Sequence, residues 1–223
     1  MIRVYGEKTD LLIDRKAEIR NIRMLQKVNF APRLYATFNN GLAYEYAPGV
    51  TLTTETVRAP DVFPLVARRL AELHAVAVPS SARAGLWVSL KKFLGLAAPS
   101  AAESALEYAR GSSADISAVD RLGSELAELE EALSGTGSPV VMCHNDLLLA
   151  NVILDASKGK VTFIDYEYAG HNYQAFDIGN HFAEFAGKLK SCPTLSCNLL
   201  GRERNSQWRK KLQGAFLSMI VRL

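Results

Sequence analysis

The sequence predicts an α+β fold in which a small β-rich unit precedes a larger and mostly helical one. Three observations support this prediction. Residues 1–50 combine strand, helix and hairpin patterns. Residues 51–187 carry two long helical patterns. Within them, a polar motif between residues 144 and 167 falls on a loop and a hairpin. We therefore divide the chain into these two units and a third segment, residues 188–223.

The first unit is expected to run strand, helix and hairpin. Residues 2–5 have a strand-like composition. Apolar residues recur at spacings of about three over residues 14–28, which predicts a helix with one face turned inward. Asn39-Asn40-Gly41 is a strong turn sequence, so the residues on either side of it are expected to pair as a hairpin, 34–38 with 42–46.

The second unit contains two helical patterns. Apolar residues over 61–78 fall mostly at spacings of three and four. Residues 116–133 carry one apolar stripe with acidic residues largely opposite, which predicts an amphipathic helix. Between them, residues 79–115 are rich in Ala and Ser and show no clear period. Residues 140–142 are expected to form a short buried strand that leads into the polar motif.

The third segment, residues 188–223, differs from the rest of the chain in charge. It holds eight basic residues and one acid, a net charge of +7, whereas residues 1–187 have a net charge of −4. A shift this abrupt predicts a boundary. A basic end could contact anionic lipid or nucleic acid. A solvated end is the simpler explanation, so we expect no nucleic-acid partner.

Cysteine use and hydropathy indicate the compartment. Three cysteines, an odd number, favour a reduced, cytoplasmic protein. Cys192 and Cys197 have no nearby histidine and do not predict a zinc site. No apolar run approaches the roughly 20 residues that a membrane span needs, and residues 1–6 do not begin a signal peptide. We therefore expect a cytoplasmic protein with no membrane span.

The most informative feature is a motif with the spacing H-x-D-x-x-x-x-N, formed by His144, Asp146 and Asn151 and followed by Asp165. Kinases use this pattern to hold a substrate hydroxyl and Mg²⁺ around a γ-phosphate. Asp146, on the loop, can accept a proton from a hydroxyl. Amide and carboxylate oxygens are the hard ligands that Mg²⁺ prefers. The motif therefore predicts a phosphotransferase site.

Hairpin register brings the predicted metal ligands together. If Leu154 pairs with Val161, Asn151 lies across the hairpin one step from Asp165. Glu167 lies two residues after Asp165 and points to the same side of an extended chain. We therefore expect Mg²⁺ at Asn151, Asp165 and Glu167.

Loop residues of these types also have structural roles. Asp, Asn and His often cap turns, and capping explains Asp146 alone as well as catalysis does, although it explains the complete motif poorly. His144 is expected to brace the loop through hydrogen bonds rather than to shuttle protons. Asp177 opens a further helix, where it could be the N-cap or brace the catalytic loop, and these roles are compatible.

With these motifs, the chain resembles the choline/ethanolamine kinase family, and ethanolamine kinases of type 2 in particular, in four stretches: residues 3–15, 31–46, 139–148 and 163–187. The resemblance implies a protein-kinase-like two-lobed fold with a truncated N-lobe sheet and a mostly helical C-lobe. It implies ATP-dependent phosphorylation of ethanolamine, a small amino alcohol, in phosphatidylethanolamine synthesis. Mg²⁺ is the implied cofactor and ATP the implied co-substrate.

The resemblance also implies roles for single residues. Arg3 takes the place of the kinase strand lysine, and Glu18 pairs with it to set the α- and β-phosphates. The hinge whose backbone meets adenine is Glu45-Tyr46-Ala47. Tyr168 and Glu184 line the amine pocket, where an aromatic face and a carboxylate suit a small cation.

The chain is expected to depart from the family at both ends. The family has a Gly-containing phosphate loop before the segment that begins at Arg3, and beyond Gly187 it continues into a long helical segment that completes the substrate pocket. Ala150 also replaces a more polar residue, at a position that is not a ligand. We therefore expect weak activity from this chain.

Other functions stay open from the sequence. The chain could be an inactive truncated isoform that acts as a binding partner, and the resemblance allows a dimer with a full-length family member. The loop motif alone also allows a choline kinase or an aminoglycoside-type phosphotransferase. The stretch 163–187 favours ethanolamine kinase over both.

Overall fold

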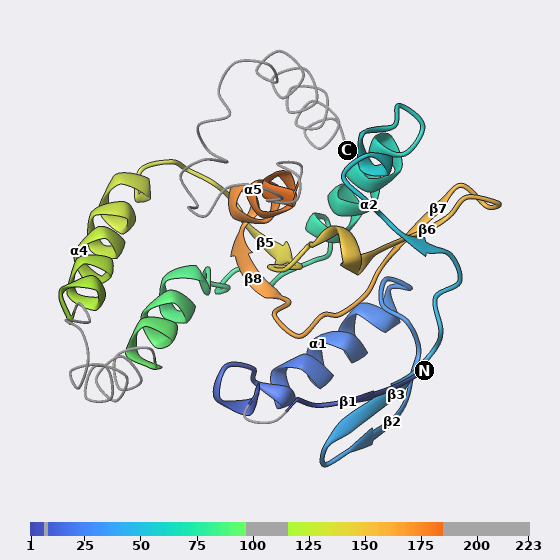
Figure 1. Cartoon of the computed structure of the whole chain (residues 1–223), viewed down its shortest axis with the longest axis horizontal. Coiled ribbons are helices and arrows are strands. Elements are labelled where there is room, and N and C mark those ends of the chain that lie inside the picture. Colours follow the sequence, from blue (N-terminus) through green and yellow to red (C-terminus); the bar gives the residue numbers. More distant parts are fainter. Residues whose placement is uncertain (7–8, 97–115, 185–223) are drawn as a thin grey trace, which may run out of the picture.

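The structure, a computed structural model, describes residues 1–6, 9–96 and 116–184. The described elements form a small β-rich group and a larger mixed group that follows it, joined through residues 45–49 (Figure 1). This is the α+β order that the sequence predicts. The basic segment 188–223 lies outside the described residues.

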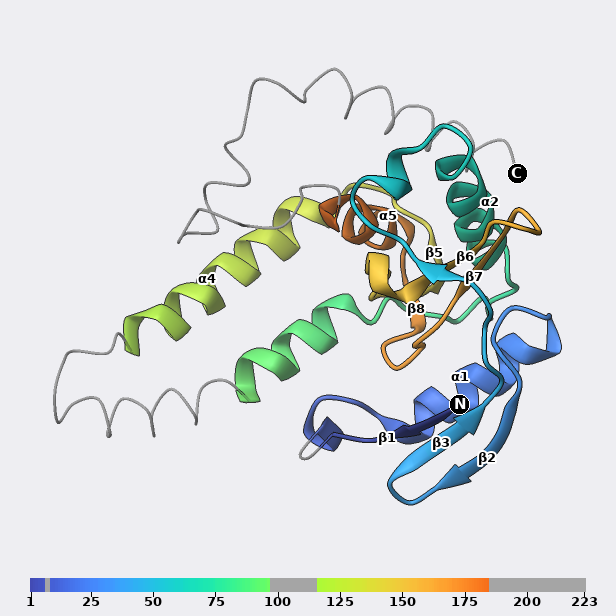
Figure 2. The same ribbon diagram turned by 45° about the vertical axis from the view of Figure 1, so that its right-hand side comes forward.

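The first group is a three-stranded antiparallel sheet with one helix packed on it (Figures 1 and 2). Gly41 permits close pairing between the strand that it begins and the strand that contains Arg3. A side chain at position 41 would clash with the backbone oxygen of Arg3. In space the strands lie in the order β1-β3-β2. In chain order the elements are β1 (Ile2–Val4), a 3₁₀ helix (Thr9–Leu11), α1 (Arg15–Lys27), β2 (Leu34–Phe38) and β3 (Gly41–Tyr44).

Helix α1 begins directly after a capping residue, Asp14, and buries one face, as its apolar spacing predicted. The carboxylate of Asp14 accepts two hydrogen bonds of 3.0 Å from backbone N–H groups of the first turn, and such an N-cap is worth about 1 kcal/mol. Ile22 and Leu25 lie on the buried face. Glu18 shares that face, so α1 carries one acidic side chain into the interior.

The second group contains two further small sheets, one of β4, β6 and β7 and one of β5 and β8. Residues 86–96 are also helical, although their sequence shows no clear period. No helix in the described part of the chain is long and apolar enough to cross a membrane. The elements in chain order are β4 (Val50–Thr51), a 3₁₀ helix (Thr56–Arg58), α2 (Phe63–His74), α4 (Ile116–Leu133), β5 (Val140–Cys143), a 3₁₀ helix (Leu149–Asn151), β6 (Val152–Asp155), β7 (Lys160–Phe163), β8 (Gly170–Tyr173) and α5 (Gln174–Ala183).

One hydrophobic core joins the two groups. Leu25 of α1 and Leu42 of β3 belong to the same buried cluster as Leu70 and Leu73 of α2 and Phe163 of β7. Helix α2 packs against both β5 and β7. Full burial of one such side chain stabilises a fold by about 1.5–3 kcal/mol. The core therefore fixes the ends of β5 and β7, where the polar motif begins and ends.

One expectation near the C-terminal end of the described chain is wrong, and one strand there was not expected. Helix α5 begins at Gln174, so Asp177 lies within the helix and Tyr173 takes the N-cap position. Strand β8 was not predicted, because Gly170–Tyr173 lacks the alternating apolar residues of a half-buried strand. It forms because its backbone pairs with β5.

Helix α4 has the predicted bounds but not the burial that its apolar stripe predicts. Leu122, Leu129 and Leu133 are 53%, 48% and 42% exposed. In both ribbon views α4 lies at the opposite end of the molecule from α2 (Figures 1 and 2). An apolar period therefore identified the helix but not its environment.

Candidate active site

A buried carboxylate holds the loop between β5 and β6. Asp177 of α5 accepts hydrogen bonds from the backbone N–H groups of His144 at 2.9 Å and Asn145 at 2.8 Å. The Nε2 atom of His74, on α2, lies 2.9 Å from the same carboxylate. Burial alone would raise the pKa of Asp177, but the hydrogen bonds from His74 and His144 hold it below its ordinary value. The start of the loop is therefore fixed by a stable negative charge.

Asn145 gives the loop its turn. Its φ of 65° lies in the left-handed region, which asparagine tolerates better than most residues. Its amide donates to the backbone oxygen of Tyr168 at 2.9 Å and accepts from the side chain of Asn172 at 2.7 Å. The Nε2 atom of His144 lies 2.9 Å from the backbone oxygen of Ile164, so His144 also ties the loop to the segment after β7.

Asp146 and Asn151 face each other across this loop. The amide of Asn151 donates to the backbone oxygen of Asp146 at 2.8 Å and lies 3.4 Å from its carboxylate. Leu154 pairs with Val161, which confirms the predicted hairpin register. The backbone N–H of Ile164 donates to the oxygen of Asn151 at 3.0 Å, so the two ends of the motif meet as expected.

The environment of Asp146 favours proton uptake. The side chain is half-buried, and this burial raises its pKa. The negative charges of Asp165, Glu167 and Glu184 raise the pKa further, whereas His144 lowers it. A carboxylate in such surroundings binds a proton more readily than an exposed aspartate, as a general base must.

Three carboxylates and two arginines form an ion cluster between α1 and the end of the hairpin. The oxygens of Glu18, Asp165 and Glu167 lie within 4.8 Å of one another. Arg3 contacts all three, at 2.5 Å from Asp165 and 3.2 Å from Glu18. Arg15 lies 2.9 Å from Glu18 and 3.2 Å from Glu167. Asp165 has a φ of 64°, a strained conformation of the kind that is frequent at functional sites.

The cluster has a donor set that suits a hard cation. Burial raises the pKa values of Glu18 and Asp165, the charge of Glu167 raises both further, and the arginines lower them. Carboxylate oxygens at this separation are ligands that Mg²⁺ accepts. Asp165 and Glu167 therefore fit the expected metal site. Asn151, the third expected metal ligand, lies beside Asp146. The third carboxylate of the cluster is Glu18, which was expected to contact the nucleotide.

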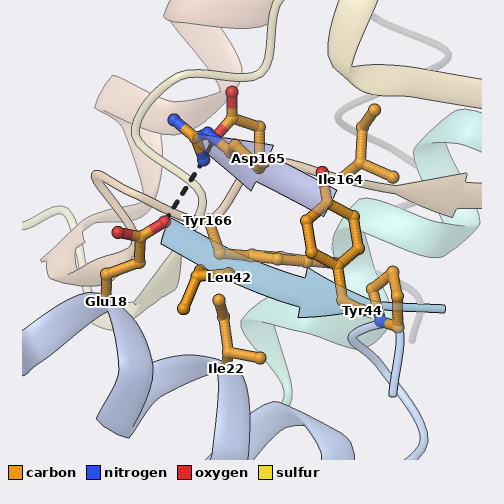
Figure 3. A pocket seen from close by; sticks show the side chains of 9 residues that line it. Glu18, Ile22, Leu42, Tyr44, Ile164, Asp165 and Tyr166 are labelled. Atoms are coloured by element: carbon orange, nitrogen blue, oxygen red, sulfur yellow. Dashed lines mark hydrogen bonds and ion pairs between the residues drawn. The ribbon is translucent and has the colours of Figure 1, made fainter. Parts of the chain in front are cut away.

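A pocket of ≈ 340 Å³, including the space at its mouth, opens beside the cluster (Figure 3). Arg3, Glu18 and Asp165 form its charged end. A pocket with a charged end and apolar walls suits a ligand that has both kinds of surface. The other walls are apolar or aromatic and consist of Ile22, Pro32, Leu42, Tyr44, Ile164 and Tyr166.

The expected hinge, Glu45-Tyr46-Ala47, lies on the connection between the two groups of elements. The backbone N–H of Glu45 donates to the oxygen of Arg33 at 2.7 Å, and Tyr46 is 60% exposed. The neighbouring Tyr44 lines the pocket, whereas the three hinge residues do not.

The residues expected to bind an amine adjoin the Asp146 loop. The backbone oxygen of Tyr168 accepts the hydrogen bond from Asn145, and burial raises the pKa of the Tyr168 hydroxyl. The carboxylate of Glu184 accepts a hydrogen bond from the backbone N–H of Leu149 at 3.4 Å. Both side chains interact electrostatically with Asp146. The structure therefore places an aromatic hydroxyl and a carboxylate near the loop.

Sequence reasoning missed four residues of the site: Arg15, Tyr44, His74 and Asn172. The spacing of Arg15 and Glu18, three residues apart on a helix, was a usable signal for an ion pair. His74 lies on the buried face of α2, which its helical period indicated, but its partner Asp177 is 103 residues away. Asn172 lies on β8, the strand that was not predicted.

The family model for choline/ethanolamine kinase matches residues 1–217 of the chain. The match extends beyond Gly187, where the sequence analysis expected the resemblance to stop. Ethanolamine kinase 2 of Mus musculus is 50% identical over 188 residues, which are 84% of this chain and 47% of that protein. The chain spans about half the length of the curated relatives it matches.

Solved structures show the same fold. An ethanolamine kinase of Plasmodium vivax has a TM-score of 0.71 and 28% identity, and the match covers 95% of this chain and 63% of that one. A choline kinase of Cryptosporidium parvum has a TM-score of 0.70 and 23% identity, with coverage of 100% and 66%. The expected two-lobed, protein-kinase-like fold is therefore confirmed.

Proposed function

The chain belongs to the choline/ethanolamine kinase family, and on this premise we propose that it transfers the γ-phosphoryl group of ATP to ethanolamine. The products are phosphoethanolamine, used in phosphatidylethanolamine synthesis, and ADP. The observation that supports this most directly is Asp146, held by a fixed loop beside a cluster of carboxylates. The ethanolamine kinases at 47–50% identity support the choice of substrate.

Asp146 is the proposed general base. The hydroxyl oxygen of ethanolamine forms a bond to the γ-phosphorus while the bond from that phosphorus to the bridging oxygen of ADP breaks. The electron pair of that bond leaves with ADP, and the hydroxyl proton passes to the Asp146 carboxylate. Asn151, 3.4 Å from this carboxylate, keeps it oriented toward the hydroxyl.

Asp165 and Glu167, with Asn151, are the proposed holders of Mg²⁺, which shields the phosphate charge when it is bound. Arg3 is the proposed phosphate contact, and Glu18 orients it. Arg3 already lies 3.2 Å from Glu18 at the charged end of the pocket. The proposed contact with adenine is the backbone of residues 45–47.

Tyr168 and Glu184 are the proposed amine site. A primary ammonium group has N–H donors for a carboxylate, and its charge is attracted to an aromatic face. The trimethylammonium group of choline has no N–H donor, so a carboxylate discriminates between the two substrates. We therefore propose ethanolamine as the preferred amino alcohol, and the cytoplasm as the place of reaction.

The test is turnover by the purified 223-residue chain with ATP, Mg²⁺ and either ethanolamine or choline. Asp146→Asn should lower kcat by about 10²–10⁴-fold, because general-base catalysis contributes that much. Asp155→Asn is the matched control, since this carboxylate lies at the far end of the same hairpin and pairs with Lys158.

A chain that binds no nucleotide and phosphorylates neither amino alcohol would contradict the proposal. It would favour the alternative of an inactive binding partner, including a dimer with a full-length family member. Equal turnover of choline and ethanolamine would overturn the proposed substrate preference alone.

A further inference from the structure

Arg15 is a half-buried cation at the candidate site with two carboxylate partners. It is the first residue of α1, and its side chain is 15% exposed. The Nη1 atom lies 2.9 Å from Glu18 and 3.2 Å from Glu167, two residues that lie 149 positions apart in the sequence. Arg15 thus links α1 to the segment that follows the hairpin.

Arg3 and Arg15 share the same two carboxylates. Arg3 contacts Glu18 and Glu167, but it also contacts Asp165, at 2.5 Å. The side chain of Glu18 is fully buried and that of Glu167 is 14% exposed, so both charges depend largely on protein partners. Each of these carboxylates therefore has two arginine partners, whereas Arg3 is the single arginine that pairs with Asp165 in the described part of the chain.

A nucleotide would change this balance. On the proposed function, Asp165 and Glu167 hold Mg²⁺ and Arg3 contacts the phosphates, so Arg3 loses these two carboxylates as partners while Glu18 still orients it. Among the described residues, Arg15 is then the arginine that still contacts both Glu18 and Glu167. We propose that Arg15 is a positioning residue that holds Glu18 and Glu167 in place while Arg3 turns toward the phosphates. The inference rests on the proposed function and assigns Arg15 a part in it.

The surroundings of Arg15 keep it still while Arg3 moves. Its Nη2 donates to the hydroxyl of Thr9 at 2.7 Å. Its guanidinium carbon lies 3.9 Å from the centre of the Tyr5 ring, a cation–π contact. Arg3, in contrast, has only the three carboxylates as charged partners among the described residues, all of which belong to the candidate site.

Arg69 provides a matched control for a purely structural role. Like Arg15, it pairs with a glutamate three residues later, at 2.9 Å, and its guanidinium carbon lies 3.5 Å from an aromatic ring, that of Phe30. Its side chain is 18% exposed. It lies on α2 and has no contact with the ion cluster among the bonds that the structure describes.

The first measurement is the affinity for Mg·ADP by calorimetry, with the full chain and its Arg15→Met, Arg15→Lys and Arg69→Met variants. Arg15→Met should weaken binding by about 10- to 100-fold, the usual effect of removing a residue that orients metal ligands. Arg15→Lys should keep only part of the wild-type affinity for Mg·ADP, because one ammonium cannot hold two carboxylates as a guanidinium does. Arg69→Met should lower the thermal midpoint and leave Mg·ADP affinity unchanged.

Steady-state kinetics of the Arg15→Met variant should show an effect on the nucleotide and none on the amino alcohol. Arg15→Met should raise KM for ATP and leave KM for ethanolamine unchanged, which a general loss of structure would not do. A second, nucleotide-free measurement is a double-mutant cycle on thermal unfolding. Because Arg3 and Arg15 share two carboxylates, losing both should lower the midpoint by more than the sum of the two single losses.

Two results overturn the inference alone: Arg15→Met with wild-type affinity for Mg·ADP, or additive effects of Arg3→Met and Arg15→Met on unfolding. A wild-type chain that binds no Mg·ADP overturns the proposed function and the inference together.

Discussion

At the scale of single residues, the site depends on side chains whose partners are buried with them. Asp177 is the clearest case, because its carboxylate accepts hydrogen bonds from two backbone N–H groups and lies 2.9 Å from His74. The motif around Asp146 was readable from the sequence because its residues are neighbours in the chain. The role of Asp177 depends on groups on three different elements.

Asp177→Ala should destabilise the fold by about 3–5 kcal/mol, because it leaves buried donors without their acceptor. Urea unfolding measures this, with Asp14→Ala for comparison. Asp14 is an exposed N-cap of α1, whose loss costs about 1 kcal/mol. Equal losses in the two variants would contradict the proposed importance of the buried carboxylate.

At the scale of elements, local sequence explains the hairpin well and the other contacts of β6 poorly. Turn residues between two strand-like runs set the pairing of β6 with β7, and the predicted register is the one observed. The short strand β4 pairs with the other edge of β6. No local pattern in residues 48–52 indicates this pairing, because it depends on where the chain leads after the hinge.

Gly49, just before β4, is the residue on which this second pairing depends. Its φ of 131° is one that side chains rarely adopt, and a Cβ atom there would clash with the backbone oxygen of Leu154. Gly49→Ala should therefore cost at least about 1–3 kcal/mol. The measurement is the free energy of unfolding in urea.

Alanine substitutions at two other glycines distinguish backbone strain from steric clash as the cause of that loss of stability. Gly135→Ala meets nothing within 4 Å and has no unusual φ, so it should be nearly neutral. Gly137→Ala meets nothing within 4 Å but has a φ of 64°, so it should cost about 1–2 kcal/mol from backbone strain alone. If Gly49→Ala costs no more than Gly137→Ala, the close approach of β4 to β6 does not contribute.

At the scale of the whole molecule, the two groups of elements are held together by one core and one ion cluster. Arg3 and Glu167 pair although 164 residues separate them in the sequence. The pH dependence of stability is also a property of the whole, because it sums the groups whose pKa values differ between folded and unfolded chains.

His181 should make the folded protein less stable as the pH falls below neutral. It is buried on α5, and burial lowers its pKa below the ordinary 6.5. Below about pH 6.5 the unfolded chain binds a proton that the folded chain does not, so stability should fall with falling pH, by up to about 1.4 kcal/mol per pH unit. Glu18, Asp146 and Asp165, with raised pKa values, act in the opposite direction at lower pH.

Urea unfolding of the wild type and His181→Gln, at about pH 7.5, 6.5 and 5.5, checks this expectation. The variant should be less stable at high pH and show a shallower decrease between pH 6.5 and 5.5. Parallel decreases in the two proteins would show that His181 is not the group responsible.

The sequence by itself determined the α+β order, helix α1, the hairpin register and the loop that carries Asp146. These features arise from residues close in the chain, where turn chemistry and periodicity act directly. Tertiary structure alone decided the pairing of β8 with β5, the exposure of the α4 stripe, the His74–Asp177 contact and the place of Arg15 between Glu18 and Glu167. The reason is physical: a buried charge or an unpaired strand is stabilised by whatever partner the fold brings to it, and no local pattern specifies a partner a hundred or more residues away.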